Sequence, residues 1–399
     1  MAAGNSESKT MIESQFEPFD FSHGINELAM REFFVWCARQ NVSDIHIQGG
    51  NNLVVDQHGR KRRASAFVLA DDTLSKIVDD VFSPEVRSMV KGGRPVDRAL
   101  QLDGDMHNRY GLERGERLRF RCNFVQATAG RLDTTIALTM RIIPSDIPDL
   151  RQMGIEDDLF EALLPPNGIG ILGGITGSGK STLAAAAYRY CQKTEPDRKI
   201  TTIEDPIEFV LGRVEDILQP TQLQIRRDVE TYEEAIRADL RRAPSIIGIG
   251  EMRDLETFQA GVLAGQLGHF NLTTMHIHSP GEAIPRCLTM VPAEMREATA
   301  RDLLGVLQYI VVQKLLRTTD GKRTAVREYI ILDDPLRSKL ADLPYTQWGQ
   351  HIDSIIRLEQ RRIADQAWRL YRQGTIDQQE LRMAMTVHQQ RAFEQGIAE

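Results

Sequence analysis

One short motif constrains this chain more than any other feature of its sequence. Residues 174–181 read G-I-T-G-S-G-K-S and match the pattern G-x-x-x-x-G-K-[ST]. The motif follows an apolar run at 169–172 and opens an alanine-rich segment at 182–190, so strand, loop and helix stand in the order that a phosphate-binding loop requires. From average residue usage, a chance match in a chain of this length is about 1 in 100. The motif therefore predicts a nucleotide-binding domain.

Each residue type in the motif has a physical role at a phosphate. Glycines let the backbone curl so that consecutive N–H groups face phosphate oxygens, and the helix N-terminus adds positive potential. Lys180 would neutralise the β- and γ-phosphates, and the Ser181 hydroxyl would ligate Mg²⁺. We therefore predict ATP and Mg²⁺ as cofactors, with the nucleotide held by Gly174, Ile175, Thr176, Gly177, Ser178, Gly179, Lys180, Ser181 and Thr182.

Four apolar runs in the second half of the chain predict an α/β fold. They alternate with helical segments, which is typical of a parallel sheet with crossover helices. The runs are 169–172, 200–203, 246–249 and 272–275.

Acidic segments follow two of these strands. Glu204 and Glu208 come after the second run, and Glu251 comes after the third. The C-terminal ends of parallel strands open toward ligands, so these carboxylates could reach the γ-phosphate. Hydrolysis needs a group that orients water and another that holds magnesium, and these acids are the candidates. Taken singly, each segment is as well explained as an ordinary acidic surface loop.

The remaining patterns divide the chain into segments. Pro144 and Pro148 interrupt any regular element and mark a linker. Short alternating runs before it predict a small α+β domain, and Ile residues at helical spacing after 345 predict a helical C-terminal part. The expected organisation is a loose tail over 1–20, an α+β domain over 21–143, a linker over 144–157, the nucleotide-binding domain over 158–335 and a helical subdomain over 336–399.

Two further stretches carry local expectations. The apolar run 303–316 is interrupted by Gln308, Gln313 and Lys314 and is shorter than the ~20 residues that span a bilayer, so it predicts a buried helix. The basic run 60–63 is expected to form a solvated turn, with a nucleic-acid or lipid patch as the alternative.

Charge and cysteine content exclude several classes of protein. The 49 Lys and Arg and 56 Asp and Glu residues give a net charge of −7, so no global basic field attracts nucleic acid or anionic lipid. The four cysteines lie far apart without a C-x-x-C pair, which suggests neither a disulfide framework nor a zinc cluster. The N-terminus lacks the basic and apolar regions of a signal peptide, and we expect a cytoplasmic protein.

Four segments together resemble the secretion ATPases of the PilT and type II/IV secretion superfamily. In order, they are the Walker A motif at 174–181, an Asp box at 202–209, a Walker B stretch at 245–254 and a His box at 268–276. The resemblance spans residues 25 to 335 and more weakly the C-terminus. It implies a RecA-like P-loop NTPase core with a PAS-like N-terminal domain and a helical C-terminal subdomain.

The resemblance also implies roles for single residues. Glu208 would be the glutamate that activates water. Glu251 would act through magnesium or water near Lys180, because Gly250 stands where many phosphate-loop enzymes place an aspartate. His269 and His276 match the two histidines of the His box, which are thought to sense the γ-phosphate and to contact a neighbouring subunit. Buried or surface histidines, or a metal site of His276 with His278, are the alternatives.

The first domain carries two segments with family resemblance. Residues 41–47 look like the stretch that opens the family's N-terminal domain, and residues 118–124 resemble its R-F-R-x-N strand. Arg119 and Arg121 are two apart and hence on one face of a strand, and Arg141 matches another family arginine. Such arginines can enter an adjacent subunit's site and stabilise phosphoryl charge. The alternative is that they are ordinary exposed strand residues.

Departures from the pilus-retraction pattern narrow the expected role. The family's C-terminal A-I-R-N-L-I-R-E motif is replaced by D-D-P-L-R-S-K-L at 333–340, and the acidic lead-in to Walker B by R-A-P-S at 242–245. The chain resembles more the branch of DotB, of type IVB (Dot/Icm) secretion, and of the conjugal-transfer ATPase TraJ.

That branch implies a homo-hexameric ATPase that powers a type IVB secretion or conjugative apparatus. It would be peripherally associated with inner-membrane components through protein contacts, without direct nucleic-acid binding. A pilus retraction motor, a RecA-like nucleic-acid motor and a non-hydrolysing nucleotide-bound scaffold are the rival functions.

Overall fold

The computed structural model divides the chain into two compact units, Met1–Ser145 and Asp146–Glu399. It describes residues 16–57, 59–107, 109–130, 132–143, 147–213 and 215–395. Most of the expected N-terminal tail and the first three residues of the expected linker lie outside these ranges. Within the described part of the chain, no helix is both long and apolar enough to cross a membrane.

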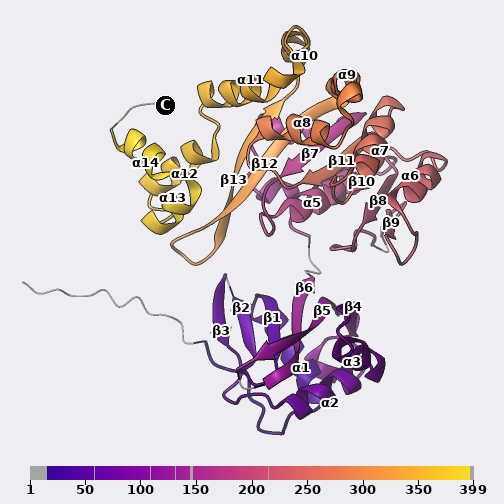
Figure 1. The fold of residues 1–399 in the computed structure, drawn as a ribbon, viewed down its shortest axis with the longest axis vertical. Helices are drawn as coiled ribbons and strands as arrows, with labels where there is room; N and C mark the ends of the chain where they lie inside the picture. The colour runs from indigo at the N-terminus through magenta and orange to yellow at the C-terminus, as the bar shows by residue number, and fades with distance from the viewer. Residues whose placement is uncertain are drawn as a thin grey trace, which may run out of the picture. The chain divides into compact units, whose positions relative to one another are not determined.

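In its described residues, unit 1 is a six-stranded antiparallel sheet with three α-helices (Figure 1). The strand order is β3-β2-β1-β6-β5-β4. Alternating apolar residues bury one sheet face against the helices, and Phe33, Phe34, Phe120 and Phe124 are fully buried there. The elements are α1 Glu27–Arg39, β1 Val42–Gln48, β2 Val54–Gln57, β3 Arg60–Arg63, α2 Asp71–Val81, α3 Pro84–Lys91, β4 Val96–Asp103, β5 Arg117–Ala129 and β6 Leu132–Ile143.

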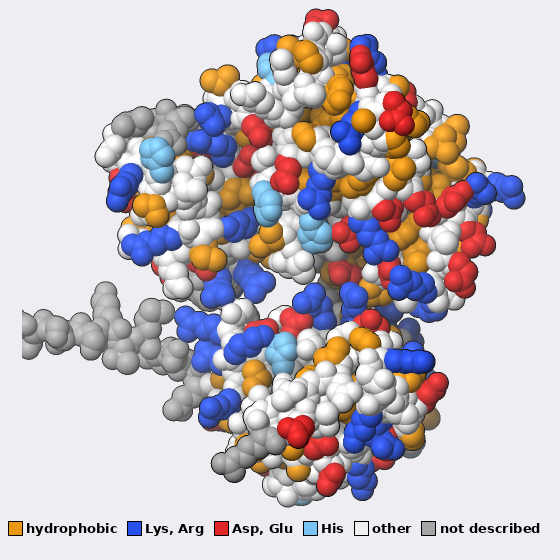
Figure 2. All heavy atoms as spheres, in the orientation of Figure 1, with side chains coloured by type: hydrophobic (Ala, Val, Ile, Leu, Met, Phe, Trp, Pro, Cys, Tyr) orange, Lys and Arg blue, Asp and Glu red, His pale blue; other side chains and the backbone are white. Residues whose placement is uncertain are grey.

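The basic run at 60–63 forms a strand, and the expectation of a solvated turn is wrong. β3 pairs with β2 at the edge of the sheet, with Arg60 opposite Gln57 and Arg63 opposite Val54. Figure 2 shows lysine and arginine side chains gathered over β2 and β3. Charged side chains on an edge strand discourage pairing with a further strand, which gives this run a structural reason.

Unit 2 is built around a seven-stranded sheet in the order β13-β12-β7-β11-β10-β8-β9. All neighbours are parallel except the β12–β13 hairpin. The strands are β7 Gly168–Gly173, β8 Ile200–Glu204, β9 Thr221–Gln224, β10 Ile246–Ile249, β11 Phe270–Met275, β12 Leu307–Arg317 and β13 Arg323–Ile331. The four apolar runs that predicted a parallel sheet are its central strands, and the α/β fold class is confirmed.

Helices cover both faces of this sheet, as parallel strands require. One face packs against α4 and α5, and the other packs against α6 to α9 and α11. The helices are α4 Asp157–Ala162, α5 Lys180–Thr194, α6 Tyr232–Leu240, α7 Leu255–Gln266, α8 Pro280–Thr289, α9 Arg296–Val306, α10 Asp334–Ala341, α11 Tyr345–Leu358, α12 Ile363–Arg372, α13 Gln378–Ala384 and α14 Val387–Glu394.

The apolar run 303–316 is mostly strand, so the prediction of a buried helix there is wrong. Helix α9 ends at Val306 and β12 begins at the next residue. β12 lies between β7 and β13 and is covered on both faces. Its sequence is therefore a continuous apolar run, and periodicity cannot distinguish such a strand from a buried helix. Its far end packs against α12 to α14, which lie beside the hairpin in Figure 1.

Glu328 on β13 is a buried carboxyl where the hairpin meets α12. Its Oε2 accepts a hydrogen bond of 3.1 Å from the Ile363 N–H. Burial raises the pKa of Glu328 from its ordinary value of 4.5 to about 7, and the negative charge of Asp353 adds to the shift. The protonated side chain is therefore the form that the fold favours.

Replacing Glu328 should change how stability depends on pH. Because the folded-state pKa is raised, the stability contributed by neutral Glu328 is fully present below about pH 4.5 and is lost as the pH rises through about 7. Glu328→Gln should therefore gain stability relative to the unmodified chain between pH 5 and pH 8, measured by urea unfolding. Glu161→Gln, at an exposed position on α4, is the control and should show no such gain. A stability difference that is the same at both pH values contradicts the assignment.

Candidate active site

The phosphate loop lies at the C-terminal end of the central strand β7. Every residue of that strand is buried, and β7 pairs with β11 on one side and β12 on the other. Helix α5 begins at Lys180, directly after the loop. The loop residues therefore stand where strand ends and a helix N-terminus meet, as expected for a site that binds anions.

Glycine is required at two loop positions because the loop is pressed against β12. Gly174 has a φ of +136°, and a Cβ there would lie 2.4 Å from the Gln313 carbonyl oxygen. Gly179 has a φ of +85°, and its Cβ would lie 2.8 Å from Gln313 Nε2. Gly177 also has a positive φ, +77°, but a Cβ there would meet nothing within 4 Å. Contact as well as backbone conformation therefore dictates glycine at 174 and 179.

The Lys180 ammonium lies across the loop. Its Nζ donates to the carbonyl oxygens of Gly174 at 2.7 Å and Ile175 at 3.0 Å. Burial lowers the pKa of Lys180, while the charges of Glu251 and Glu208 oppose that shift. The fold thus brings together the lysine and two of the carboxylates that the sequence singled out.

Glu204, the last residue of β8, is largely buried and hydrogen-bonded to the segment that carries Glu208. Glu204 Oε1 accepts hydrogen bonds from the Thr202 hydroxyl at 2.7 Å and from Gln222 Nε2 at 3.2 Å. Its Oε2 accepts the Glu208 N–H at 3.3 Å. Burial raises the pKa of Glu204. Through these bonds Glu204 can hold the backbone at Glu208 in place. Glu204 also lines a pocket with Ser181, Gly250 and Thr274.

Glu251 faces His276 across neighbouring strand ends. Glu251 follows β10, and its Oε1 lies 3.4 Å from Nε2 of His276, the residue after β11. The Thr274 hydroxyl donates to the Gly250 carbonyl at 2.6 Å and holds the two strand ends together. A Cβ at Gly250 would lie only 3.2 Å from the Ile203 carbonyl, so a larger side chain would crowd β8.

His269 lies at the opposite end of the central strands, before β11 begins. It precedes β11, whose first residue Phe270 is level with Gly168, the first residue of β7. The His269 Nδ1–H donates to the Pro244 carbonyl at 2.7 Å. The structure therefore does not bring His269 together with the phosphate loop of its own chain.

His278 does not form part of a metal site in the described part of the chain. In the ranges that the structure covers, three or more His, Cys, Asp or Glu side chains do not converge on any point suited to a metal ion. The alternative of a metal held by His276 and His278 thus has no third protein ligand of these types there. The His278 N–H donates instead to Glu282 Oε2 at 2.6 Å, at the start of α8.

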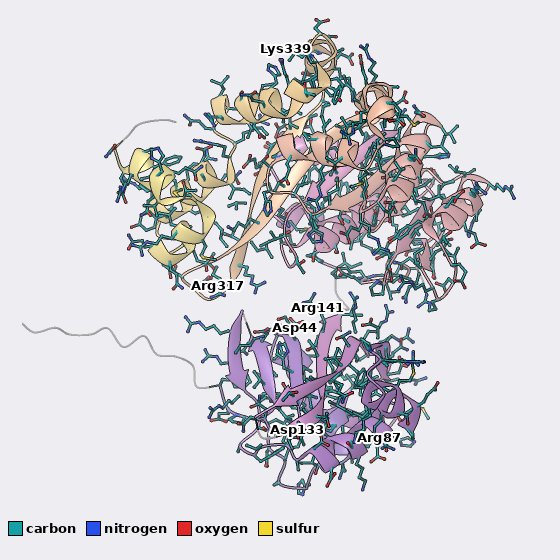
Figure 3. The ribbon with its side chains drawn as sticks, viewed as in Figure 1. Asp44, Arg87, Asp133, Arg141, Arg317 and Lys339 are labelled. Atoms are coloured by element: carbon teal, nitrogen blue, oxygen red, sulfur yellow. The ribbon has the colours of Figure 1, made fainter. Side chains whose placement is uncertain are left out.

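The three arginines of the first domain share one sheet face in unit 1. Arg121 on β5 stands directly opposite Arg141 on β6, and Arg119 is two residues before Arg121 on the same face. Arg141 Nε lies 2.9 Å from Asp44 Oδ1 on β1, and Figure 3 labels this pair. Phe120 between them is buried, as its position on the strand predicts.

Two residues near the loop escaped the sequence analysis. Gln222 holds Glu204, and Gln313 contacts the loop from β12. Gln222 sits in the short strand β9 and carries no pattern that separates it from other glutamines. The signal for Gln313 was present, because it is one of the few polar residues in the apolar run 303–316.

Comparison with known proteins shows the family of this chain. The family described as type II/IV secretion system protein matches residues 34–392. The chain belongs to this family. It is 29% identical to the type IV pilus retraction ATPase PilT of Pseudomonas aeruginosa over 311 residues, covering 78% of this chain and 85% of that protein. It is also 30% identical to the uncharacterised Escherichia coli protein YggR over 334 residues, with 82% and 95% coverage.

Solved structures place this secretion ATPase near DotB. The ATPase DotB of Legionella pneumophila has a TM-score of 0.80 and 28% identity, covering 93% of this chain and 97% of that one. The pilus retraction motor PilT with bound ADP has a TM-score of 0.72 and 28% identity, covering 90% and 97%. These neighbours confirm the RecA-like core and the resemblance to DotB.

The loop residues fit a bound nucleotide. The Ser178 hydroxyl is 2% exposed and has no hydrogen-bond partner, so an acceptor such as a phosphate oxygen would satisfy it. The three positive-φ glycines give the curled backbone that a phosphate cradle needs. The Ser181 hydroxyl and the Glu251 carboxylate are oxygen ligands of the type that Mg²⁺ prefers.

Alanine at Gly174 should cost more than alanine at Gly177. Both changes place a Cβ in a positive-φ conformation, which costs about 1 to 3 kcal/mol, but only Gly174→Ala also drives the side chain into the Gln313 carbonyl. We expect Gly174→Ala to lower the Tm clearly below that of Gly177→Ala and to abolish ATP binding, measured by calorimetry. Equal losses of stability and affinity in the two variants would contradict the close contact with β12.

Proposed function

We propose that this chain hydrolyses ATP with Mg²⁺ and uses the energy to drive a secretion or conjugation apparatus. The observation that carries the proposal is the phosphate loop at the end of β7, where Lys180 lies across the loop and the charges of Glu251 and Glu208 act on its pKa. Membership of the secretion family supports the same chemistry.

The carboxylates divide the catalytic work. Glu208 activates the attacking water as general base, held in place through its N–H by buried Glu204. Ser181 and Glu251 would hold Mg²⁺, which when bound neutralises developing phosphoryl charge. His276 contacts Glu251 and reports the state of the γ-phosphate through it. His269, at the opposite end of the central strands, contributes to a neighbouring subunit.

The working form is a homo-hexameric ring. Arg119, Arg121 and Arg141 of unit 1 act on the nucleotide of a neighbouring subunit, where guanidinium groups stabilise charge on the transferred phosphoryl. The Asp44 carboxylate holds Arg141 in a fixed direction. The ring attaches to inner-membrane components from the cytoplasmic side through protein contacts.

Type IVB secretion or conjugation is the role that we favour. The high similarity to the ATPase DotB over nearly the whole chain supports it. The pilus retraction motor PilT is also similar, and retraction is the second candidate. The replacement of the retraction motif by D-D-P-L-R-S-K-L at 333–340 argues against that candidate. These residues form the N-cap and nearly all of helix α10.

A nucleic-acid motor and a non-hydrolysing scaffold are the remaining rivals. The net charge of −7 disfavours the first, since a motor that tracks nucleic acid needs a basic channel. DNA-stimulated turnover would favour that motor. ATP binding without turnover in the assembled protein would favour the scaffold.

Removing Lys180 or Glu208 should abolish turnover. We expect Lys180→Ala and Glu208→Gln each to lower phosphate release by about 100-fold or more, because one removes phosphate neutralisation and the other the base. Lys193→Ala, at the other end of α5, and Glu234→Gln, exposed on α6, are matched controls and should retain turnover. Undiminished phosphate release in both site variants would rule out this site.

Mixing inactive subunits tests the arginine assignment. Arg119→Ala and Lys180→Ala chains should each be inactive alone. When mixed, some interfaces pair an intact arginine with an intact phosphate loop, so part of the phosphate release should return. Mixed rings that stay as inactive as either variant would show that the arginine does not act across an interface.

A further inference from the structure

Two buried polar residues lie directly behind the phosphate loop. Gln313 on β12 and Arg327 on β13 face each other across the hairpin and are 3% and 1% exposed. The Arg327 Nε–H donates to Gln313 Oε1 at 2.9 Å. Burying a guanidinium costs free energy unless its donors are hydrogen-bonded. The hydrogen-bond partners of this pair therefore indicate what the pair does.

Gln313 fixes one peptide of the phosphate loop. Its Nε2 donates to the Ser178 carbonyl at 2.7 Å. Because a trans peptide is planar, with its C=O and N–H pointing in opposite directions, this bond turns the Gly179 N–H away from β12. Only glycine at 179 lets the amide approach, since a Cβ would lie 2.8 Å from it. The donor that faces a phosphate is thus oriented from behind.

Arg327 links Gln313 to the backbone of residues 153 and 154. Its two terminal nitrogens donate to the Gly154 carbonyl at 2.9 Å and the Met153 carbonyl at 3.0 Å. Glu156 Oε2 lies 3.8 Å from Arg327 and balances its charge. Residues 147–156 are the segment through which the chain enters unit 2 from unit 1. A continuous set of hydrogen bonds therefore runs from the loop to this connecting segment.

Helix α12 is hydrogen-bonded to the backbone of Arg327. Gln366 on α12 accepts the Arg327 backbone N–H at 3.1 Å and donates to the Arg327 carbonyl. Arg327 is therefore held at both its backbone and its guanidinium. It has little freedom to adapt if the loop or the connecting segment shifts.

The other end of β12 supplies a matched comparison. Gln308 donates to the Asn167 carbonyl at 3.1 Å, and Arg337 donates to Gln308 Oε1 at 3.2 Å. This pair has the same Arg–Gln–carbonyl chemistry but ends at the start of β7, away from the phosphate loop. Gln308 is less buried than Gln313, and its replacement tests whether the loss of a Gln–carbonyl bond elsewhere on β12 affects nucleotide binding.

We propose that Gln313 and Arg327 are positioning residues that hold the Ser178–Gly179 peptide for phosphate binding and couple the phosphate loop to the segment connecting the two units. The inference rests on the proposed binding of ATP at this loop. Because coupling is reciprocal, a nucleotide at the loop and the conformation of residues 147–156 each affect the other.

Nucleotide affinity tests the positioning. Gln313→Leu leaves the Ser178 carbonyl without its donor, and Gln313→Glu keeps the acceptor for Arg327 but presents an oxygen to that carbonyl. Each should weaken binding of the fluorescent analogue mant-ATP to the full chain by about 10-fold, as for a lost buried hydrogen bond. The KM for ATP should rise by a similar factor. Gln308→Leu should bind like the unmodified chain.

Amide exchange tests the coupling. Addition of ATP should slow hydrogen exchange in residues 147–156 of the unmodified chain and of Gln308→Leu, and this slowing should be lost in Arg327→Met. If Arg327→Met does not fold, judged by circular dichroism, Gln313→Glu carries the test, and its slowing should be reduced.

The outcomes separate this inference from the function on which it rests. Equal mant-ATP affinity in all variants, or no ATP-dependent exchange in 147–156 of a chain that binds ATP, overturns the inference and leaves the proposed function standing. An unmodified chain that binds no mant-ATP overturns the proposed function itself.

Discussion

The close packing of the phosphate loop against β12 is the contact on which the site depends. Two loop glycines leave no room for a side chain on that face, and Gln313 fills the space behind them. With the loop held there, Lys180 begins α5 and faces the acidic ends of β8 and β10.

The sequence predicted the parts of the site that chemistry dictates. A glycine-rich loop between strand and helix, and acids at the ends of parallel strands, follow from how phosphate and magnesium are bound. The prediction was wrong where burial hides periodicity: most of 303–316 belongs to β12, a strand covered on both faces whose apolar run resembles a buried helix. The basic run 60–63 forms an edge strand because its partner β2 supplies the hydrogen bonds.

Pairing between distant segments is the information that local patterns lack. His269 and His276 match one family motif, yet the six residues of β11 between them place them at opposite ends of that strand. Gln313 interrupts an apolar run, but its role depends on a loop 135 residues away in sequence. The C-terminal helices likewise cap the hairpin through Leu316 and Val326, which no spacing rule connects to them.

The most direct test of this account is a structure of the full chain with Mg²⁺ and a non-hydrolysable ATP analogue. The account predicts that the Lys180 ammonium leaves the Gly174 and Ile175 carbonyls and contacts the β- and γ-phosphates, with the metal beside Ser181 and the γ-phosphate facing Glu208. A triphosphate bound away from this loop, or Lys180 still bonded to both carbonyls beside it, would contradict the account.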